Sequence, residues 1–266
     1  IDIRILNVSD MTDAIKTVFI TGGASGIGWA TADEFATRGW RVTIGDLDLA
    51  KAEKRAAEHP GKILALALDV TDRAAVAKAF AQSQGHWGRL DALVNNAGVQ
   101  RHAHLESLSF EDWSAVLDVN LNGSFHCLQA AANTMLPQGS GAIVNVASVA
   151  ATRGAPGRAA YAVSKAAILS LTRTAAVEWS ERGLRVNAVA PGYVETDLLT
   201  TAIVEGRLNT EPIIARIPTR RLAEPREIAK SIYFLCSDEA SYVTGHMLHV
   251  DGGFEADYGV PFFLPK

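Results

Sequence analysis

Short apolar runs alternate with longer helical stretches along almost the whole chain, and this alternation restricts the fold more than any other feature. The runs are rich in Val, Ile and Leu and apolar on both faces, which is typical of strands buried in a parallel sheet. Parallel strands need crossover connections, and the intervening helical stretches supply them. The sequence therefore predicts an α/β fold with a doubly wound parallel β-sheet flanked by helices on both faces. At 266 residues, such a chain usually stays a single domain.

The expected element boundaries follow from where each apolar run or helical period ends. Strands are expected at residues 18–20, 42–44, 63–68, 92–94, 142–146, 185–189 and 247–250. Helices are expected at residues 26–38, 49–58, 73–84, 111–136, 160–181 and 224–236. Residues 196–221 have weak periodicity and are predicted to form a lid over a site. The domain is expected to cover residues 11–266, with an appended or disordered arm at 1–10 and an aromatic tail at 254–266.

Composition excludes several classes of function. Hydrophobic residues make up 48% of the chain, which excludes a disordered protein. The formal charge of −4, with mixed signs, predicts no binding to nucleic acid or to an anionic membrane surface, and no apolar run has membrane-spanning length. Cys127 and Cys236 are far apart and lack a metal-type spacing, so buried reduced thiols and a cytoplasmic location are expected. His102 and His104 form an H-x-H pair without a third ligand, and no metal site is predicted.

A glycine-rich turn joins the first expected strand to the first expected helix, and its sequence is Thr21-Gly22-Gly23-Ala24-Ser25-Gly26-Ile27-Gly28. Glycine lets the backbone turn tightly and approach a phosphate without a Cβ in the way. The following helix directs its free N–H groups and the positive end of its dipole at a pyrophosphate. The spacing differs from the GxGxxG pattern, but the place between strand and helix indicates a Rossmann-type dinucleotide site.

Asp46 follows the second expected strand and stands 18 residues after Gly28. This offset matches the acidic residue that accepts hydrogen bonds from the adenosine ribose in dinucleotide-binding folds. A carboxylate there would repel a 2′-phosphate, and no Lys or Arg adjoins it in the sequence to neutralise one. Asp46 therefore favours NAD(H) over NADP(H). The alternative role is that of a helix N-cap, which is also open to Asp48.

Tyr161 and Lys165 are four residues apart within an expected helix, so their side chains share a face. A free tyrosine has a pKa near 10 and is a poor base at neutral pH. A nearby cation stabilises the phenolate and lowers that pKa, so such a pair can exchange a proton with a substrate. Alone, the pair is common by chance and usually marks a solvated helix face.

Several motifs accompany the pair in a fixed order, and together they resemble the short-chain dehydrogenase/reductase family in its single-domain branch. They are Thr21–Gly28, Asn95-Asn96-Ala97-Gly98, Ser148, Tyr161-x-x-x-Lys165 and Pro191-Gly192. The resemblance covers nearly everything from Thr17 to Gly253, and as a set the motifs are highly specific.

The resemblance implies four catalytic residues: Asn120, Ser148, Tyr161 and Lys165. Ser148 would hydrogen-bond the substrate oxygen, and Tyr161 would exchange a proton with it. Lys165 would lower the pKa of Tyr161 and hold the nicotinamide ribose. Asn120 matches the family asparagine that holds a water linking Lys165 to solvent.

The resemblance and the nucleotide motifs together imply the contacts of an NAD(H) cofactor. Asp69 and Val70 resemble an adenine-binding pair, and the segment from Pro191 to Thr196 resembles one that holds the nicotinamide carboxamide. The expected contacts are Gly22, Ser25, Gly26, Ile27, Gly28, Asp46, Leu47, Asp69, Val70, Asn96, Ala97, Gly98, Tyr161, Lys165, Pro191, Gly192, Val194 and Thr196.

The expected function is hydride transfer between NAD(H) and a secondary alcohol or ketone, such as a polyol, sugar, cyclic alcohol or steroid. One alternative is a 3-oxoacyl thioester reductase, a class that usually prefers NADPH. Another is a non-catalytic NAD-binding regulator, which the complete catalytic set disfavours. An epimerase or dehydratase of the longer related branch is disfavoured because no large C-terminal domain follows. Enoyl reductases of the family space Tyr and Lys more widely.

Loops at 99–105, 149–158 and 193–216 are expected to build the substrate pocket. The candidate substrate contacts are Ser148, Arg101, Arg158 and Tyr193, and Arg153 also borders this region. The resemblance further implies a homotetramer. The tail carries Phe254, Tyr258, Phe262, Phe263 and Leu264, and it is predicted to pack onto a neighbouring subunit because such side chains are not expected in water.

Overall fold

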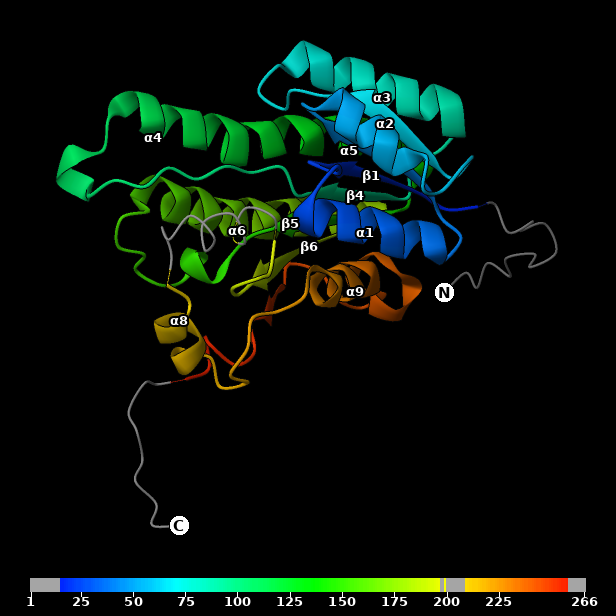
Figure 1. The fold of residues 1–266 in the computed structure, drawn as a ribbon. Coiled ribbons are helices and arrows are strands. Elements are labelled where there is room, and N and C mark those ends of the chain that lie inside the picture. The colour runs from blue at the N-terminus through cyan, green and yellow to red at the C-terminus, as the bar shows by residue number, and fades with distance from the viewer. Residues whose placement is uncertain (1–14, 197–198, 200–208, 258–266) are drawn as a thin grey trace, which may run out of the picture.

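The computed structural model describes residues 15–196, 199 and 209–257. Its centre is a seven-stranded sheet in the order β3-β2-β1-β4-β5-β6-β7, in which every neighbouring pair is parallel (Figure 1). The strands are β1 (Thr17–Thr21), β2 (Arg41–Asp46), β3 (Ile63–Ala67), β4 (Ala92–Asn95), β5 (Gly141–Val146), β6 (Leu184–Pro191) and β7 (Met247–Val250). The predicted doubly wound sheet is confirmed.

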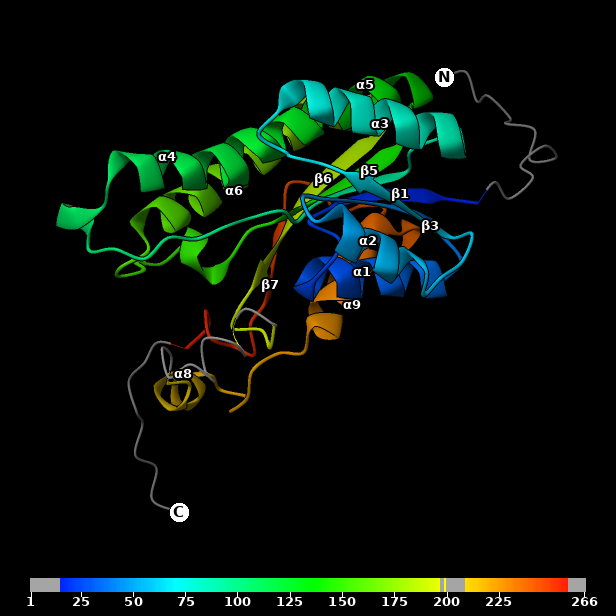
Figure 2. The same cartoon turned by 45° about the horizontal axis from the view of Figure 1, so that its top comes forward.

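Helices cover both faces of this sheet, as Figure 2 shows. The main helices are α1 (Gly26–Thr37), α2 (Leu49–Ala56), α3 (Arg73–Trp87), α4 (Phe110–Leu117), α5 (Ser124–Gln138), α6 (Ala159–Trp179), α8 (Glu211–Arg216) and α9 (Pro225–Cys236). Helices α1, α2 and α9 lie on one face, and α3, α5 and α6 lie on the other. The short helix α8 lies beyond the sheet, near the end of the described chain (Figure 1).

Local sequence signals fix where several helices begin. The Asp72 side chain accepts bonds from the N–H groups of Ala74 and Ala75, so α3 starts there. Asp48 caps α2 by accepting a bond from the N–H of Lys51. The sequence had left open whether Asp46 or Asp48 filled this role, and Asp48 is the cap.

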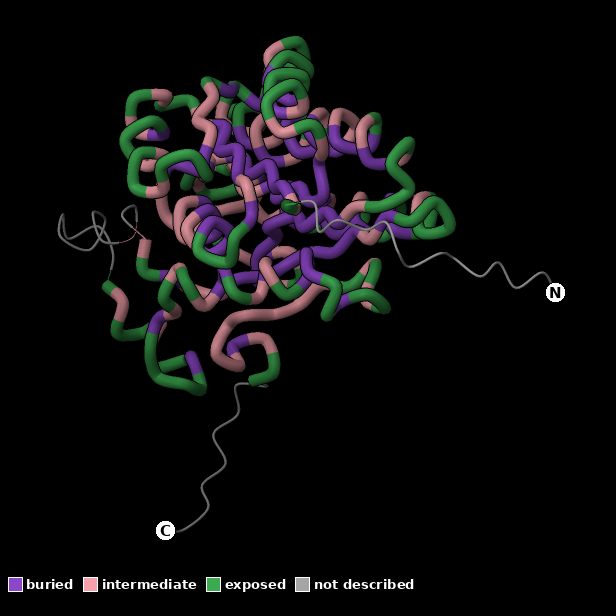
Figure 3. The backbone as a smooth tube through the Cα atoms, turned by 90° about the vertical axis from the view of Figure 1, so that its right-hand side faces the viewer, coloured by how far each residue is buried: buried purple, intermediate pink, exposed green. Residues whose placement is uncertain are grey.

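Two apolar cores lie on opposite sides of the sheet, and the most buried chain runs through its middle (Figure 3). One core packs α1 and α9 against the sheet, through side chains such as Phe35 and Ile232. The other packs α3 and α5 against it and includes Phe80 and Met135. Both cysteines are buried and free, as expected, and burial raises the pKa of each thiol to about 12.

The long helix expected at residues 111–136 is interrupted. A π-helical turn, Asp118–Gly123, separates α4 from α5. Apolar periodicity did not reveal it because a π-turn adds a residue without changing which residue types are buried. The turn places Gly123 against Val70, where an added Cβ would lie 2.6 Å from a Val70 methyl carbon.

The predicted lid is described only in part. It contains α8, and Leu222, which follows it, packs with Ile217 and Phe254. Residues 197–198 and 200–208 lie outside the described residues. The arm at 1–10 and residues 258–266 of the tail also lie outside them. No helix in the described part of the chain has the length and hydropathy needed to cross a bilayer.

Candidate active site

The carboxyl ends of the seven parallel strands meet at one edge of the sheet, and the predicted site residues follow these ends. The chain leaves β1 and β4 in opposite directions, because β2 lies on one side of β1 and β5 on the far side of β4. Such a switch point opens a crevice in which open α/β sheets bind ligands. The glycine-rich turn follows β1, and the segment Asn96–Gly98 follows β4, so both border this crevice.

The glycine-rich turn is packed too tightly for side chains. A Cβ on Gly28 would lie 2.0 Å from the carbonyl oxygen of Gly22, and Gly22 itself has a φ of +63°. Ser25 makes no side-chain cap bond to α1, and the first turn of this helix has no acidic residue. These features leave the helix start open to an anion, as a pyrophosphate site requires.

Thr21 and Asn96 hold this turn against the end of β4. The Thr21 hydroxyl oxygen accepts bonds from the N–H groups of Asn96 and Ala97, both at 3.0 Å. The Asn96 side-chain amide donates in return to the carbonyl oxygens of Thr21 and Gly22, both at 3.0 Å. The Asn96 side chain therefore shapes the nucleotide turn. The Thr21 hydroxyl is an element of the site that the sequence motif contained but did not explain.

Asp46 ends β2 beside the same turn. Its carboxylate accepts bonds from the N–H of Ala24 at 3.0 Å and from the N–H of Asp48 at 3.1 Å. Each oxygen keeps a second lone pair, so the anchored carboxylate remains able to accept from a ribose hydroxyl. Leu47 follows it and is 76% exposed.

The remaining predicted cofactor contacts occupy the neighbouring strand ends. Asp69 is exposed, and its Oδ1 accepts bonds from the N–H and hydroxyl of Thr71, whereas Val70 is buried. Val194 is buried and pairs with Ala223. Thr196 approaches Gly26, where an added Cβ would lie 3.4 Å from the Thr196 methyl carbon. The segments after β1 and β6 thus meet, which places the expected pyrophosphate and carboxamide contacts side by side.

Ser148, Tyr161 and Lys165 come together beyond this crevice. The Ser148 hydroxyl lies close enough to the Tyr161 hydroxyl to lower its pKa. Lys165 is buried at 5% exposure, and its Nζ lies 5.7 Å from the centroid of the Tyr161 ring. That Nζ donates a 2.7 Å bond to the carbonyl oxygen of Val146, at the end of β5. Ser148, which follows β5, thus lies close to Tyr161 and Lys165 of α6.

Burial dominates the acid–base properties of this group. It raises the pKa of Tyr161 above its ordinary value, while the hydrogen bond from Ser148 and the charge of Arg158 both lower it. Burial also lowers the pKa of Lys165 to about 8. The cation that acts on Tyr161 here is Arg158, three residues earlier. The predicted effect of Lys165 on this pKa stays a prediction for the cofactor-bound protein.

Asn120 is fully buried in the π-helical turn and ties it to its surroundings. Its Oδ1 accepts a 2.8 Å bond from the N–H of Val99, and its Nδ2 donates to the Val99 carbonyl oxygen and to Ser164 Oγ, both at 3.0 Å. Ser164 lies between Tyr161 and Lys165 in α6. Asn120 therefore fixes both the loop after β4 and helix α6. The water predicted between Asn120 and Lys165 stays a prediction.

A chain of buried polar groups extends this connection through the sheet. Asn145 in β5 donates to the Thr172 hydroxyl of α6 and accepts from Asn95 of β4, both at 2.9 Å. Asn95 also donates to the carbonyl oxygen of Ser124 at 3.3 Å, and the Ser124 hydroxyl donates to the carbonyl oxygen of Asn120 at 2.8 Å. Through Ser164, the chain begins and ends on α6. Sequence reasoning missed it, because Asn145 and Thr172 belong to no motif.

The candidate substrate contacts lie in different environments. The Arg101 side chain faces Asp112, with Nε 3.4 Å from Oδ1, which weakens the case for it as a substrate ligand. Arg158 is half-buried near Tyr161, and its backbone pairs with Ala103, so the loops at 99–105 and 149–158 lie together as predicted. Tyr193 packs edge-on against Phe254, with ring centroids 5.7 Å apart.

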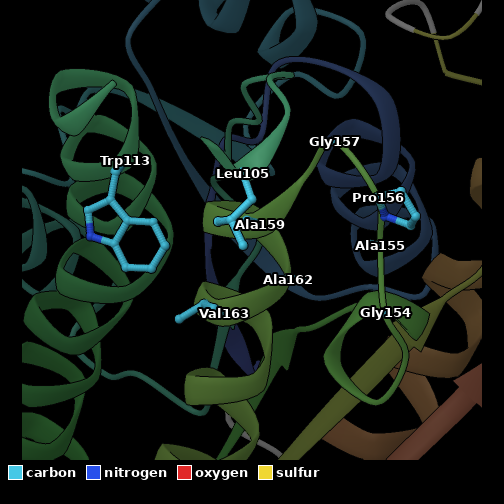
Figure 4. Close-up of a pocket in the computed structure, with 9 residues that line it drawn as sticks. All are labelled: Leu105, Trp113, Gly154, Ala155, Pro156, Gly157, Ala159, Ala162 and Val163. Atoms are coloured by element: carbon cyan, nitrogen blue, oxygen red, sulfur yellow. The ribbon is translucent and has the colours of Figure 1, made fainter. Parts of the chain in front are cut away.

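An apolar groove lies beside these groups, at the start of α6. Leu105, Trp113 and Val163 line it together with residues 154–157, and it encloses about 520 Å³ (Figure 4). Figure 4 shows Trp113 and Val163 coming from neighbouring helices. The catalytic side chains do not line it. It is an apolar surface feature on the outer side of the catalytic helix.

Comparison with known proteins identifies reductases and dehydrogenases that are similar to this chain. A family model described as enoyl-(acyl carrier protein) reductase matches residues 22–255. A 3-oxoacyl-(acyl-carrier-protein) reductase of Thermotoga maritima is 44% identical over 90% of this chain and 97% of its own. A cis-4-hydroxycyclohexanecarboxylate dehydrogenase of Sinomonas cyclohexanicum is 42% identical over 91% of this chain and 98% of its own.

Solved structures of similar proteins have the same fold as this chain. The structure of ElxO with NADP bound has a TM-score of 0.88 and 35% identity, and covers 91% of this chain and 100% of its own. A 3-ketoacyl-(acyl-carrier-protein) reductase from Brucella melitensis complexed with NADH has a TM-score of 0.85 and 35% identity, over 90% and 98%. The two structures carry different nicotinamide dinucleotides.

Proposed function

The chain belongs to the short-chain dehydrogenase/reductase family, and on that premise we propose that its described site interconverts a secondary alcohol and a ketone with a nicotinamide dinucleotide. The observation that carries this proposal is the meeting of Ser148, Tyr161 and Lys165 beside a glycine-rich nucleotide turn. A regulator that only binds the nucleotide would not need a buried lysine beside a half-buried tyrosine. Both groups are costly to bury and therefore favour catalysis.

The protein's own residues manage the substrate oxygen and its proton. When bound, the nicotinamide ring supplies or accepts the hydride at the substrate carbon. The Ser148 hydroxyl donates a hydrogen bond to the substrate oxygen and orients it. The Tyr161 hydroxyl donates its proton to that oxygen in reduction and accepts it in oxidation. Because burial raises the pKa of Tyr161, the phenol holds its proton at neutral pH and is ready to donate it.

Lys165 and the nucleotide turn have supporting roles. We propose that Lys165 holds the nicotinamide ribose and stabilises the tyrosinate once the cofactor is bound. The free N–H groups at the start of α1 bind the pyrophosphate, and Gly28 lets the helix approach it. The segment from Pro191 to Thr196 holds the carboxamide end.

Two substrate classes fit this site. The strongest curated match described above is a 3-oxoacyl-(acyl-carrier-protein) reductase, which favours reduction of a 3-oxoacyl thioester. The hydroxycyclohexanecarboxylate dehydrogenase, at 42% identity, supports the alternative of a small secondary alcohol. We place the thioester first. Two assays distinguish these substrate classes. One measures reduction of acetoacetyl-coenzyme A, and the other measures oxidation of a panel of secondary alcohols and polyols.

Asp46 supports NAD(H) as the preferred cofactor. Its carboxylate stands beside the nucleotide turn, where it would repel a 2′-phosphate. Titration of the protein's fluorescence with NADH and NADPH should show tighter binding of NADH. In Asp46→Asn, the difference in affinity between NADH and NADPH should become smaller. Asp48→Asn is the matched control, because it removes a neighbouring charge whose side chain caps α2. Equal affinity for both cofactors in the unmodified protein would overturn this preference.

The assembly and location follow as proposals of the same kind. Leu105 and Val163 line the apolar groove and are 71% and 47% exposed, which supports burial against a second copy within a homotetramer. Sedimentation or light scattering would measure the mass directly. Two free, buried cysteines support a cytoplasmic location.

Tyr161→Phe tests the catalytic proposal. The variant keeps the ring and removes the hydroxyl that exchanges the proton, so kcat should fall by about 100-fold or more. Cofactor affinity and melting temperature should stay close to those of the unmodified protein. Tyr242→Phe is the matched control, since Tyr242 is fully exposed. Full turnover by Tyr161→Phe would overturn the mechanism.

A further inference from the structure

The described C-terminal segment follows β7 and packs against the loop after Ser148 and the end of the predicted lid. Asp251 starts it, with its Oδ1 accepting from the N–H of Gly253 at 2.9 Å and its Oδ2 from the N–H of Glu255 at 2.8 Å. The N–H of Thr219, at the end of the lid, donates to the carbonyl oxygen of Gly252 at 3.2 Å. These bonds fix the backbone from which the next two side chains project.

Glu255 binds the loop that follows Ser148. Its Oε1 accepts a 2.9 Å bond from the Thr152 hydroxyl, and its Oε2 accepts a 2.5 Å bond from Arg153 Nε. Arg153 Nη2 also donates to the Glu255 carbonyl oxygen. The side chains of Arg153 and Glu255 are 32% and 26% exposed, so the pair is only partly screened by water.

Phe254 binds the lid and the segment after β6. Its ring is 9% exposed and packs in a cluster with Val149, Ile217 and Leu222. The guanidinium groups of Arg153 and Arg216 lie 5.5 Å and 5.1 Å from the ring centroid, and Arg216 ends helix α8. Both cations lie within the range in which an aromatic ring attracts a positive charge.

These contacts join three segments that are distant in sequence. They are the loop 149–153, Tyr193 after β6, and the end of the lid at 216–222. Val149 directly follows Ser148, and Ser148 caps the 3-10 turn Val149–Ala151 by accepting from the N–H of Ala150. A displacement of this loop therefore moves the hydroxyl that orients the substrate.

We propose that Phe254 and Glu255 form a C-terminal clamp, which acts as a positioning device for Ser148 and for the substrate side of the active site. The clamp rests on the proposed function, since it acts through Ser148. Its expected effect is on substrate binding, and not on the nucleotide turn at the start of α1. A partly exposed ion pair contributes little to global stability, so its loss should leave the melting temperature almost unchanged.

The test compares Glu255→Gln with the unmodified protein by two measurements. Hydrogen–deuterium exchange of the peptide covering 149–158 should become faster in the variant, because the amide removes the negative charge that pairs with Arg153 and one of the two side-chain oxygens that accept from Thr152 and Arg153. The KM for the substrate should rise by about tenfold, which is ~1.4 kcal/mol, while kcat changes less and the affinity for NADH stays the same. Glu239→Gln is the matched control, since Glu239 is exposed in the Asp238–Ala240 turn.

A second pair of variants separates the ion pair from general damage. Arg153→Glu alone should reproduce the faster exchange and raised KM, and Arg153→Glu with Glu255→Arg should restore part of both. Unchanged exchange in Glu255→Gln would refute the clamp itself. Faster exchange with an unchanged KM would refute its positioning role. If the unmodified protein turns over neither thioesters nor alcohols, the proposed function fails, and the exchange measurement still decides whether the clamp exists.

Discussion

Single residues in the site differ most from their ordinary behaviour where they are buried. Tyr161 and Lys165 both have their charged forms disfavoured by loss of water, in opposite pKa directions. Arg158 is the nearby cation that acts on Tyr161. No motif indicated this role, because Arg158 belongs to none of the family motifs in the sequence.

Replacing Arg158 tests how the pKa of Tyr161 is set. Arg158→Gln removes a positive charge that lowers this pKa, so the pKa should rise. In the oxidation direction the tyrosine must accept a proton, and the pH of half-maximal kcat/KM should move upward. Arg173→Gln, on the exposed side of the same helix, should leave the profile unchanged. A downward shift in Arg158→Gln would contradict the argument.

Lys165→Met should stabilise the protein while abolishing activity. The folded pKa of about 8 lies below the ordinary 10.5, so the folded state carries a penalty for the charge at any pH below 8. That penalty is about 3 kcal/mol, offset in part by the bond to Val146. At pH 7 the melting temperature of Lys165→Met should therefore exceed that of the unmodified protein by a few degrees.

The same argument fixes the pH dependence of that gain. Between pH 8 and about 10.5 the unfolded state binds more protons, so the stability of the unmodified protein rises with pH through this window. The advantage of Lys165→Met should shrink over the same range in thermal melts. Lys78→Met, at an exposed position of α3, serves as the control. An advantage that grew with pH would show that burial of the charge is not the cause.

At the scale of elements, the order and type of the strands and main helices were predictable because the central strands β1, β2, β4, β5 and β6 are buried on both faces. The glycine-rich turn and the Tyr161–Lys165 face also followed from local sequence. The π-helical turn at Asp118–Gly123 did not, since it buries the same residue types as an α-helix would. The contact between Arg153 and Glu255 joins positions 102 residues apart, and no periodicity records such a pair.

Two helical glycines should respond in opposite ways to alanine. In Gly28→Ala the new Cβ would lie 2.0 Å from the carbonyl oxygen of Gly22, so α1 must shift away from the nucleotide turn. We expect a lower melting temperature and cofactor binding weakened by about tenfold or more. Gly85→Ala in α3 meets no atom within 4 Å and should stabilise the protein by about 0.5–1 kcal/mol. Native cofactor affinity in Gly28→Ala would contradict this account of the turn.

At the scale of the whole molecule, the site residues and the tight turns from helix to strand lie at opposite edges of the sheet. The nucleotide turn, the catalytic group and the C-terminal clamp all follow the carboxyl ends of strands. The opposite edge carries the tight turns from helix back to strand. Gly61 is one of them, with a φ of +72° and open space where a Cβ would stand. This division follows from the parallel topology of the sheet.

This division makes the molecule a candidate carrier for other proteins. A reporter domain spliced in at Gly61 would leave from the edge remote from the site, and lengthening a surface loop costs little in closure entropy. Such a fusion should keep the kcat and KM of the unmodified enzyme. The same domain spliced in after Gly98 would separate Val99 from Asn120 and should destroy turnover. Comparing the two fusions in one assay would show that this protein tolerates a fused domain at the sheet edge remote from its active site.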